Sequence, residues 1–428
     1  MKLKYLFVTL LIFSSLQAKQ TLTIDQIVEL TLKHSPDIDS SRFDFKAAKQ
    51  RVKSAEGLYL PTLDLSASAG KQGSKLKGQN FDSSDLLRGS IGASQLLYDF
   101  GKTTGRIDGS KKEALAYEAK MQQIISDKIF IVKKSYYNIL KAKSFIDVQY
   151  KNVTLQRQQL NRAKKYLKSG IKTIIDVTDA QVELEQAILD LENAKYDLEL
   201  QRATLEEAMG FEPNNGNYDV YKRKVTLSNL SKKLPKVSSS LNRLESFAYI
   251  HRYAMQSSKH MIESAKSNVN TQTGRYYPTI SLGADYTTQK VNGIAAGMLP
   301  EDQGSIAVNV NWNLFEGQRT DAAVQEAKIS VLRASSQLQS VKLAIKKQVV
   351  DSYIGLRRSK KNVLLSQSIA KASLEKYIQA KKRYENELAD YIELQQARQG
   401  YIESLSNVVE SYYNYYISLA QLDHSIGK

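Results

Sequence analysis

An apolar residue recurs at every seventh position through two long stretches of the chain. The first covers residues 125–167, and the second covers 177–205, where a stripe of alanines accompanies the larger residues. A strict seven-residue repeat keeps one seam facing a partner only if the helices supercoil, so both stretches predict coiled-coil helices. The repeated positions are Ile125, Val132, Ile139, Ile146, Val153, Leu160 and Leu167, then Val177, Leu184, Leu191, Leu198 and Leu205, with Ala180, Ala187 and Ala194.

The helix that contains the first stretch is predicted to be very long. We expect it to run from about 102 to 168, which is roughly 100 Å at about 1.5 Å per residue. A helix of that length does not fit inside a compact globule. The pattern therefore indicates a rod or the wall of a tube.

Four shorter segments alternate apolar and polar residues with a period of two, which is typical of β-strands. The polar, glycine-containing segments near 70–87 and 289–304 are expected to be the loops between them. The last strand is the clearest, with Ile306, Val308, Val310, Trp312 and Leu314 against Ser305, Ala307, Asn309, Asn311 and Asn313.

Two interpretations of these strands are open. They belong either to a transmembrane β-barrel or to a small soluble sheet with one wet face. Aromatic side chains near the strand ends favour the membrane interpretation, because such rings settle at head-group level. They are Tyr59, Tyr98, Phe100, Tyr276, Tyr277 and Phe315.

The chain also matches itself in one register. Pro61 and Pro278 share a Tyr-Leu/Tyr-Pro-Thr context, which gives a shift of 278 − 61 = 217, and the same shift pairs His34 with His251. We expect a duplicated unit in which a helix, two strands, a very long helix, a tight turn and another helix follow one another. The predicted organisation is a signal peptide at 1–18, a first repeat at 19–211, a linker at 212–238 and a second repeat at 239–428.

The first residues indicate export from the cytoplasm. Lys2 and Lys4 precede a short apolar run, and Ala18 is a plausible cleavage point, as in a signal peptide. No later segment offers about 18 uninterrupted apolar residues, so we expect any membrane crossing to use strands. The chain has no cysteine, which excludes disulfides, thiolate metal sites and a lipid anchor on a new terminal cysteine.

Four strands per chain are too few to close a barrel, since about eight is the smallest number that closes around packed side chains. An open sheet edge in lipid would leave backbone groups unpaired. Several chains are therefore expected to share one barrel, with eight strands in a dimer or twelve in a trimer.

Charge and motifs exclude other classes. The formal net charge of +17 suits a nucleic-acid partner, but a signal peptide argues against one. The four histidines are too scattered for a metal site, and no phosphate loop or hydrolase motif occurs. We expect no catalytic residues, no cofactor and no bound metal.

The ordered motifs of the mature chain resemble one known family. Leu-Tyr-Asp-Phe-Gly follows the second strand at 97–101, and Ser-Gly at 169–170 precedes Asp-Val-Thr-Asp-Ala-Gln at 176–181. Together with the duplication, these segments are similar to the TolC-type outer-membrane efflux proteins over residues 22–428. The resemblance implies an α+β membrane protein in which four strands per chain join a trimeric twelve-stranded β-barrel, continued by a long α-helical coiled-coil barrel in the periplasm.

The resemblance also implies function and partners. It implies a passive duct of a tripartite efflux or type I secretion system, set in outer-membrane lipid, with a periplasmic adaptor and an inner-membrane transporter as partners. The helix-to-helix turns at 168–173 and 385–389 would meet the adaptor. The residues there are Gly170, Ile171, Lys172, Glu387 and Leu388.

The same turns are where such a tunnel would close. The resemblance assigns the constriction to Asp176, Asp179, Tyr384 and Glu393, with Asp176 linked to Tyr384. Ala389 occupies a position where the family often has arginine, so Lys172 and Asp179 are expected to substitute in the closing network. The competing interpretation of Asp176 and Asp179 is simple stabilisation of a helix start by acidic residues.

Two other functional classes remain open from the sequence. A periplasmic coiled-coil scaffold would keep the seven-residue repeats and make the strands incidental. A basic nucleic-acid-binding coiled coil would require the chain to stay in the cytoplasm.

Overall fold

The computed structural model describes residues 20–74, 82–214, 218–221, 234–235, 239–292 and 300–428. The predicted signal peptide and much of the predicted linker lie outside these residues. The chain forms two compact units. The hairpin unit comprises Met1–Asp39, Ile125–Ala248 and Lys347–Lys428, and the sheet unit comprises Ser40–Ile124 and Tyr249–Lys346.

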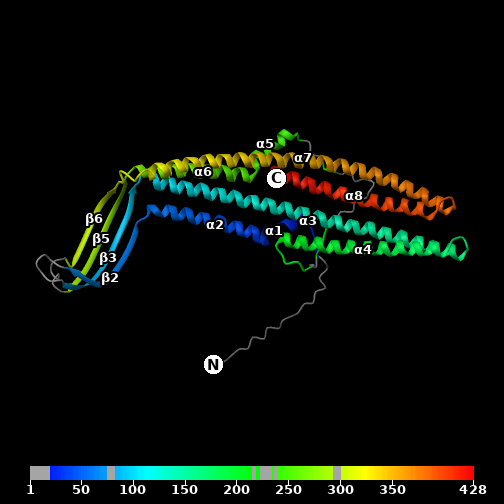
Figure 1. Ribbon diagram of the computed structural model, residues 1–428, viewed down its shortest axis with the longest axis horizontal. Coiled ribbons are helices and arrows are strands. Elements are labelled where there is room, and N and C mark those ends of the chain that lie inside the picture. Colours follow the sequence, from blue (N-terminus) through cyan, green and yellow to red (C-terminus); the bar gives the residue numbers. More distant parts are fainter. Residues whose placement is uncertain (1–19, 75–81, 215–217, 222–233, 236–238, 293–299) are drawn as a thin grey trace, which may run out of the picture. The chain divides into compact units, whose positions relative to one another are not determined.

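Two long helices contribute residues to both units: α3 (Lys102–Lys168) and α7 (Arg319–Glu385). The hairpin unit adds the two helices that return from their ends (Figure 1), and a short parallel pair of strands. Its further elements are β1 (Gln20–Leu22), α1 (Ile24–His34), α4 (Ile174–Met209), β4 (Tyr218–Val220), α5 (Leu241–His251) and α8 (Tyr391–Ile426). The sheet unit holds most of α2 (Pro36–Glu56), with β2 (Thr62–Ser74), β3 (Asp82–Tyr98), α6 (Tyr253–Thr273), β5 (Thr279–Asn292) and β6 (Asp302–Asn311).

Corresponding helices of the two halves have equal lengths. Helices α3 and α7 both contain 67 residues, and α4 and α8 both contain 36. Their starts keep the register of the sequence, since Arg319 follows Lys102 by 319 − 102 = 217 and Tyr391 follows Ile174 by the same interval. The predicted order of elements is confirmed in the described residues.

The single helix predicted before the first strand of each half is divided into two helices. Helix α1 ends at His34 and α2 begins at Pro36, because proline has no amide hydrogen to continue the ladder and forces Ser35 into an extended conformation. The second half breaks at the corresponding place, between α5 and α6 at Arg252, without a proline. That break has no signal in the local sequence.

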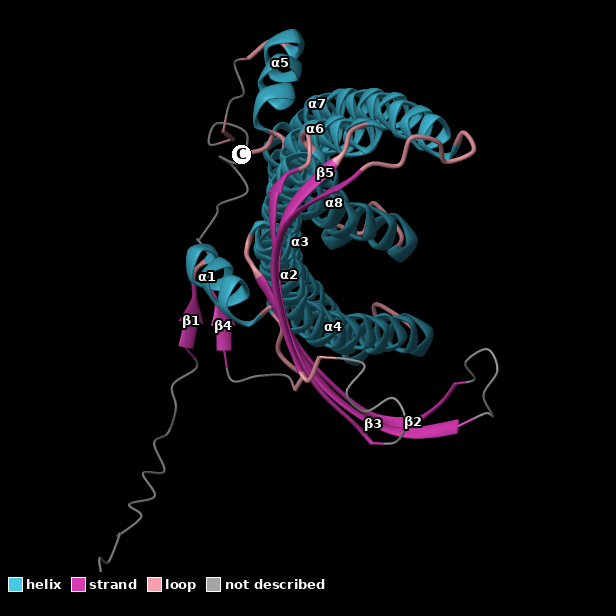
Figure 2. Cartoon of the chain, turned by 90° about the vertical axis from the view of Figure 1, so that its left-hand side faces the viewer, coloured by secondary structure: helices cyan, strands magenta, loops and turns pink. Residues whose placement is uncertain are grey.

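The four long strands form one antiparallel sheet in the order β2-β3-β5-β6, which Figure 2 shows as a curved layer. The register aligns residues of like character across the strands. One row joins Asp64, Gly92, Asp285 and Ser305, and the next joins Leu65, Ile91, Tyr286 and Gly304. The alternation in the sequence therefore produces one polar and one largely apolar face.

The strand ends differ from the prediction. Strand β2 continues to Ser74, β3 begins at Asp82, and β5 continues to Asn292. The predicted loops near 70–87 and 289–304 were therefore too broad. Polar side chains and glycines in these segments concealed the pairing. The last strand was predicted too far along the chain, because β6 begins at Asp302 and ends at Asn311, before the predicted end at Leu314. The Trp312 indole then donates to the Tyr276 carbonyl at 3.0 Å.

The core of the hairpin unit is made of the predicted seven-residue stripes. Val153 and Leu160 on α3 pack against Val177 and Leu184 on α4, and Ala180 is fully buried between them. Small residues at the contact let neighbouring helices approach closely. The predicted coiled-coil packing is confirmed at these positions.

Candidate functional site

Two turns join the long helices to their return helices, at 169–173 between α3 and α4 and at 386–390 between α7 and α8. Both are Schellman-type helix ends. In the first, Ile171 N–H donates to the Tyr166 carbonyl at 3.0 Å, and in the second, Leu388 N–H donates to the Arg383 carbonyl at 2.8 Å. The turns lie where the break in the seven-residue repeat predicts them.

Lys172 and Tyr384 bring the two hairpins together beside the first turn. The ammonium of Lys172 lies 5.4 Å from the centre of the Tyr384 ring, a cation–π contact. Tyr384 is 2% exposed and belongs to the core cluster that contains Val177 and Ala180 of α4. Its ring thus anchors α7 of the second hairpin in the core of the first.

Asp176 lies at the start of α4 and acts there as a capping group. Its Oδ2 accepts hydrogen bonds from the Thr173 amide at 3.0 Å and from the Thr173 hydroxyl at 2.9 Å. Partial burial opposes ionisation, but these two bonds and the charge of Lys172 outweigh it, so the pKa of Asp176 is lowered. The direct contacts of Asp176 are therefore those of the helix-stabilising interpretation.

Tyr384 and Asp176 are neighbours without a direct bond. Burial raises the pKa of the Tyr384 phenol, and the negative charge of Asp176 adds to the rise. The phenol hydroxyl has no hydrogen-bond partner among the described residues, and the Gln159 amide lies near it outside hydrogen-bond geometry. The predicted pair is brought close within one chain but not linked.

The other two predicted constriction residues lie apart from this pair. Asp179 is exposed one turn further along α4, where its charge contributes to raising the pKa of the buried Tyr391, behind the larger effect of burial. Glu393 lies at the start of α8 and pairs with Arg383 at 3.4 Å. The guanidinium of Arg383 also donates to the Leu388 carbonyl at 3.3 Å. Arg383 therefore ties the second turn together.

The turns carry a patch of exposed isoleucine and leucine that the sequence prediction covered only in part. Ile171 and Leu388 were predicted as contact residues, but three isoleucines beside them were missed. The sequence held a signal for them. These isoleucines lie at the starts of helices but outside the seven-residue stripe that is buried, so an exposed position could have been expected. The tip patch consists of Ile171, Ile174, Ile175, Leu388 and Ile392, which are 47–69% exposed.

A second feature that the sequence did not reveal is a buried arginine. Arg398 on α8 is 2% exposed, and its Nη2 lies 3.9 Å from Glu183 Oε2 on α4. Glu183 also accepts from the side chains of Gln395 and Gln156, the latter at 3.4 Å. Polar residues of three helices therefore meet in the interior of the hairpin unit.

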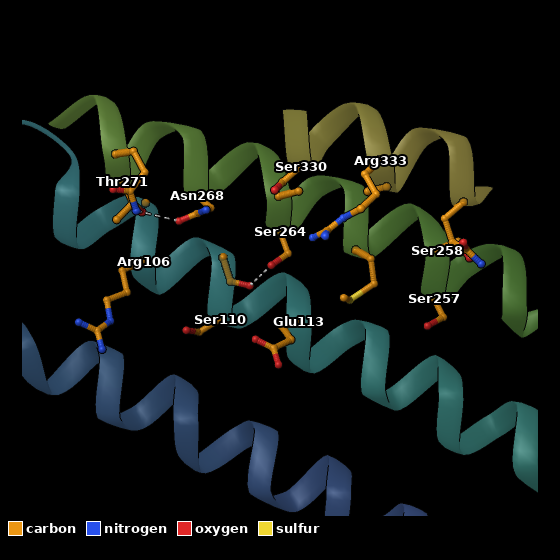
Figure 3. A pocket seen from close by; sticks show the side chains of 17 residues that line it. Arg106, Ser110, Glu113, Ser257, Ser258, Ser264, Asn268, Thr271, Ser330 and Arg333 are labelled. Atoms are coloured by element: carbon orange, nitrogen blue, oxygen red, sulfur yellow. Dashed lines mark hydrogen bonds between the residues drawn. The ribbon is translucent and has the colours of Figure 1, made fainter. Parts of the chain in front are cut away.

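The sheet unit has a groove of about 800 Å³ over α6, flanked by α3 and α7 (Figure 3). Its serine hydroxyls serve helix packing: Ser264 donates to the Gly109 carbonyl and Ser257 to the Ala116 carbonyl, both at 3.0 Å. A Cβ at Gly105 would lie 2.8 Å from the Thr271 amide nitrogen, so only glycine allows this approach. The serines and the glycine that line the groove therefore serve the packing of α6 against α3.

Two features are absent from the described ranges. No group of three or more His, Asp or Glu side chains is placed to hold a metal ion. Among the helices that the structure describes, none is both long enough and apolar enough to cross a membrane.

The duplicated helical hairpins and the four-stranded sheet define the class of protein. The chain belongs to the outer membrane efflux protein family, whose model matches residues 27–211 and 246–428. Membership of this family places the chain in the outer membrane and gives it a role in efflux.

Individual relatives agree in sequence and in fold. Outer membrane protein TolC of Vibrio cholerae is 22% identical, with 100% of this chain and 95% of the relative covered. Outer membrane efflux protein BepC of Brucella suis is 20% identical over 84% of this chain and 75% of its own length. The CmeC outer membrane channel of Campylobacter jejuni superposes with a TM-score of 0.80 at 16% identity, covering 94% of this chain and 85% of that chain.

Proposed function

We propose that this chain is one of three identical subunits of a passive export duct that performs no catalysis. Three copies would place twelve strands in one outer-membrane barrel and continue it as a tube of helices. The observation that carries the proposal is a sheet whose two outer edges have no strand partner in the described residues, because further strands would complete it.

The sheet supports assembly with other copies. It ends at β2 on one side and at β6 on the other, and neither outer edge has a strand partner in the described part of the chain. Unpaired strand edges and an uncovered apolar face both require partners, and in lipid every backbone group must be paired. Ile306, Val308 and Val310 of β6 are 80%, 62% and 64% exposed. Lipid would cover this face, and neighbouring copies would pair the edges.

Helix α4 supports the same assembly. One of its stripes packs inside the chain, and a second apolar stripe with the same seven-residue spacing faces away from it. An exposed seam of this kind needs a partner helix. We assign the part of this stripe beyond the tip patch, Val182, Leu189 and Tyr196, to the contact with a neighbouring copy. The four residues of the α4 outer stripe are Ile175, Val182, Leu189 and Tyr196, which are 66%, 62%, 53% and 63% exposed.

We further propose that the turn region is the closing end of the duct. Asp176, Tyr384, Asp179 and Glu393 would form the constriction, and three copies would give a ring of carboxylates that favours cations. Asp176 supports this role, because Lys172 and the Thr173 hydrogen bonds keep it ionised at neutral pH. Closure would be conformational, with hairpins moving apart to open.

The tip patch, with Gly170, Lys172 and Glu387 beside it, would receive a periplasmic adaptor that links the duct to an inner-membrane transporter. Exposed aliphatic side chains at two adjacent turns suit docking of a helical hairpin with its own apolar end. No nucleic-acid partner is proposed.

Single-channel conductance in planar bilayers tests the closing role. Asp176→Ala should raise the conductance several-fold and reduce the preference for cations. Asp176→Asn keeps an oxygen that can accept from Thr173 and removes the charge, so it separates ion preference from helix capping. Tyr384→Phe should raise the conductance less, because the hydroxyl has no protein partner in the described residues. Unchanged conductance and ion preference for Asp176→Ala and Tyr384→Phe would overturn the assignment.

A further inference from the structure

Arg398 is a cation in the interior of the hairpin unit. Its side chain is 3% exposed, although an arginine remains charged at any physiological pH. A buried charge is stable only with a compensating partner. The sole carboxylate paired with it in the described residues is Glu183, at 3.9 Å, and Nη2 has no hydrogen bond there.

Glu183 collects contacts from both hairpins. Gln156 of α3 donates to it from the first hairpin, and Gln395 of α8 donates to it from the second. Its side chain is 30% exposed, so it is less buried than Arg398. The carboxylate is therefore one point at which α8 is held to α3 and α4, beside the bond from Lys151 on α3 to the Tyr401 hydroxyl on α8 at 2.7 Å.

The surroundings of this pair are poorly satisfied. Buried polar atoms of Gln149, Gln156, Gln159, Tyr384 and Tyr391 have no hydrogen-bond partner among the described residues. Polar groups left unpaired in a protein interior weaken the contact in which they lie. The seam near the turns holds two charge pairs, Arg398 with Glu183 at 3.9 Å and Arg162 with Glu385 at 2.7 Å. The rings of Tyr384 and Tyr391, both from the second hairpin, pack into the apolar core of the first.

We propose that Arg398 is a positioning residue for the closed tip: paired with Glu183, it locks α8 against α4 and so holds Tyr384 in the core of the first hairpin. The inference rests on the proposed closing role of the turns. Removing Glu183 leaves the Arg398 charge buried without its carboxylate, and removing Arg398 takes away the ion pair that joins α8 to α4. Either single loss therefore loosens the seam. Removing both charges leaves no isolated charge behind.

Hydrogen exchange of the detergent-extracted full-length protein tests the lock without reference to conduction. Arg398→Met keeps the length of the side chain and removes its charge. It should speed opening of the α4 and α8 amides near the turns by about 100-fold, which corresponds to about 3 kcal/mol at about 1.4 kcal/mol per tenfold. Glu183→Gln should have a similar effect, and the double variant should be less affected than the sum of the two.

Arg157→Met is the matched control, because it removes the same charge from an exposed position on α3 beside Gln156. It should leave the exchange of α4 and α8 unchanged. Additive effects of the two single variants, or an equal effect of the control, would overturn the lock.

Conductance then separates this proposal from the closing role. If exchange accelerates in Arg398→Met and conductance rises, both proposals stand. If exchange accelerates and conductance does not change, the lock stands and the closing role of the turns fails. If exchange does not change, the lock fails regardless of conductance.

Discussion

Gly170 and Glu387 occupy corresponding places in the two turns and share a left-handed backbone, with φ of 71° and 61°. Glycine adopts this conformation freely, whereas a residue with a Cβ is strained by about 1–2 kcal/mol. A Cβ at Gly170 would meet nothing within 4 Å, so its cost is purely conformational. The second turn bears a strain that the first avoids.

Gly170→Ala should therefore loosen the first turn. The expected cost is about 1 kcal/mol, or about fivefold faster hydrogen exchange of the Ile171 amide. Glu387→Ala is the matched control, because both residues carry a Cβ in the same conformation, and exchange at Leu388 should hardly change. Equal acceleration in the two variants would show that the left-handed backbone is not the cause.

At the scale of elements, helix α4 carries two apolar stripes, of which one is buried inside the chain and the other is exposed. Val177, Leu184 and Leu191 are buried inside the chain, whereas Val182 and Leu189 point away from that core. Both stripes have the same spacing, so the sequence predicts the helix without telling which seam is internal.

Leu189→Glu should prevent assembly while leaving the chain folded. A carboxylate placed in an apolar seam is costly to bury without a partner, so the trimer should dissociate at least about 100-fold more readily. The mass of the detergent-extracted complex measures this, with an unchanged helical circular dichroism signal as the check on folding. Lys195→Glu, which changes an exposed residue of α4 outside this stripe, is the control and should remain trimeric. A trimeric Leu189→Glu would remove α4 from the interface.

At the scale of the whole molecule, sequence repeats and compact units divide the chain differently. Each unit takes residues from both halves, because α3 and α7 each contribute one part to the sheet unit and another to the hairpin unit. The predicted boundaries at 19–211 and 239–428 describe the duplication of the chain. That these two ranges are separate domains remains a prediction.

Photo-cross-linking in the intact cell tests the partner assigned to the tip patch. A photoreactive residue at Ile174 or Leu388 should capture a periplasmic adaptor. The same residue at Tyr150, which is 66% exposed on α3, is the control and should not. Capture of the adaptor from Tyr150 alone would place docking away from the turns.

Much of the fold follows from the sequence because its signals are periodic or local. Seven-residue spacing gives the helices, period-two alternation gives the strands, and the shift of 217 residues gives the duplication. The turns near Gly170 and Glu387 follow from interruptions of the helical repeat. Strand ends were less predictable, since the glycines and polar residues of 70–74 and the polar residues of 82–85 nevertheless pair in the ladder.

The tertiary structure decided what depends on neighbours distant in the sequence. In the sequence, Arg398 looks like any other charged residue on a solvated helix face. Only the packing of α8 against α3 and α4 buries it beside Glu183. The same holds for Asp176, whose acidic character marks a helix start in the sequence, while the proximity of Tyr384 comes from the meeting of two hairpins. Periodicity fixes the structure of each helix, but the choice between equivalent seams is made by the surface that each helix meets.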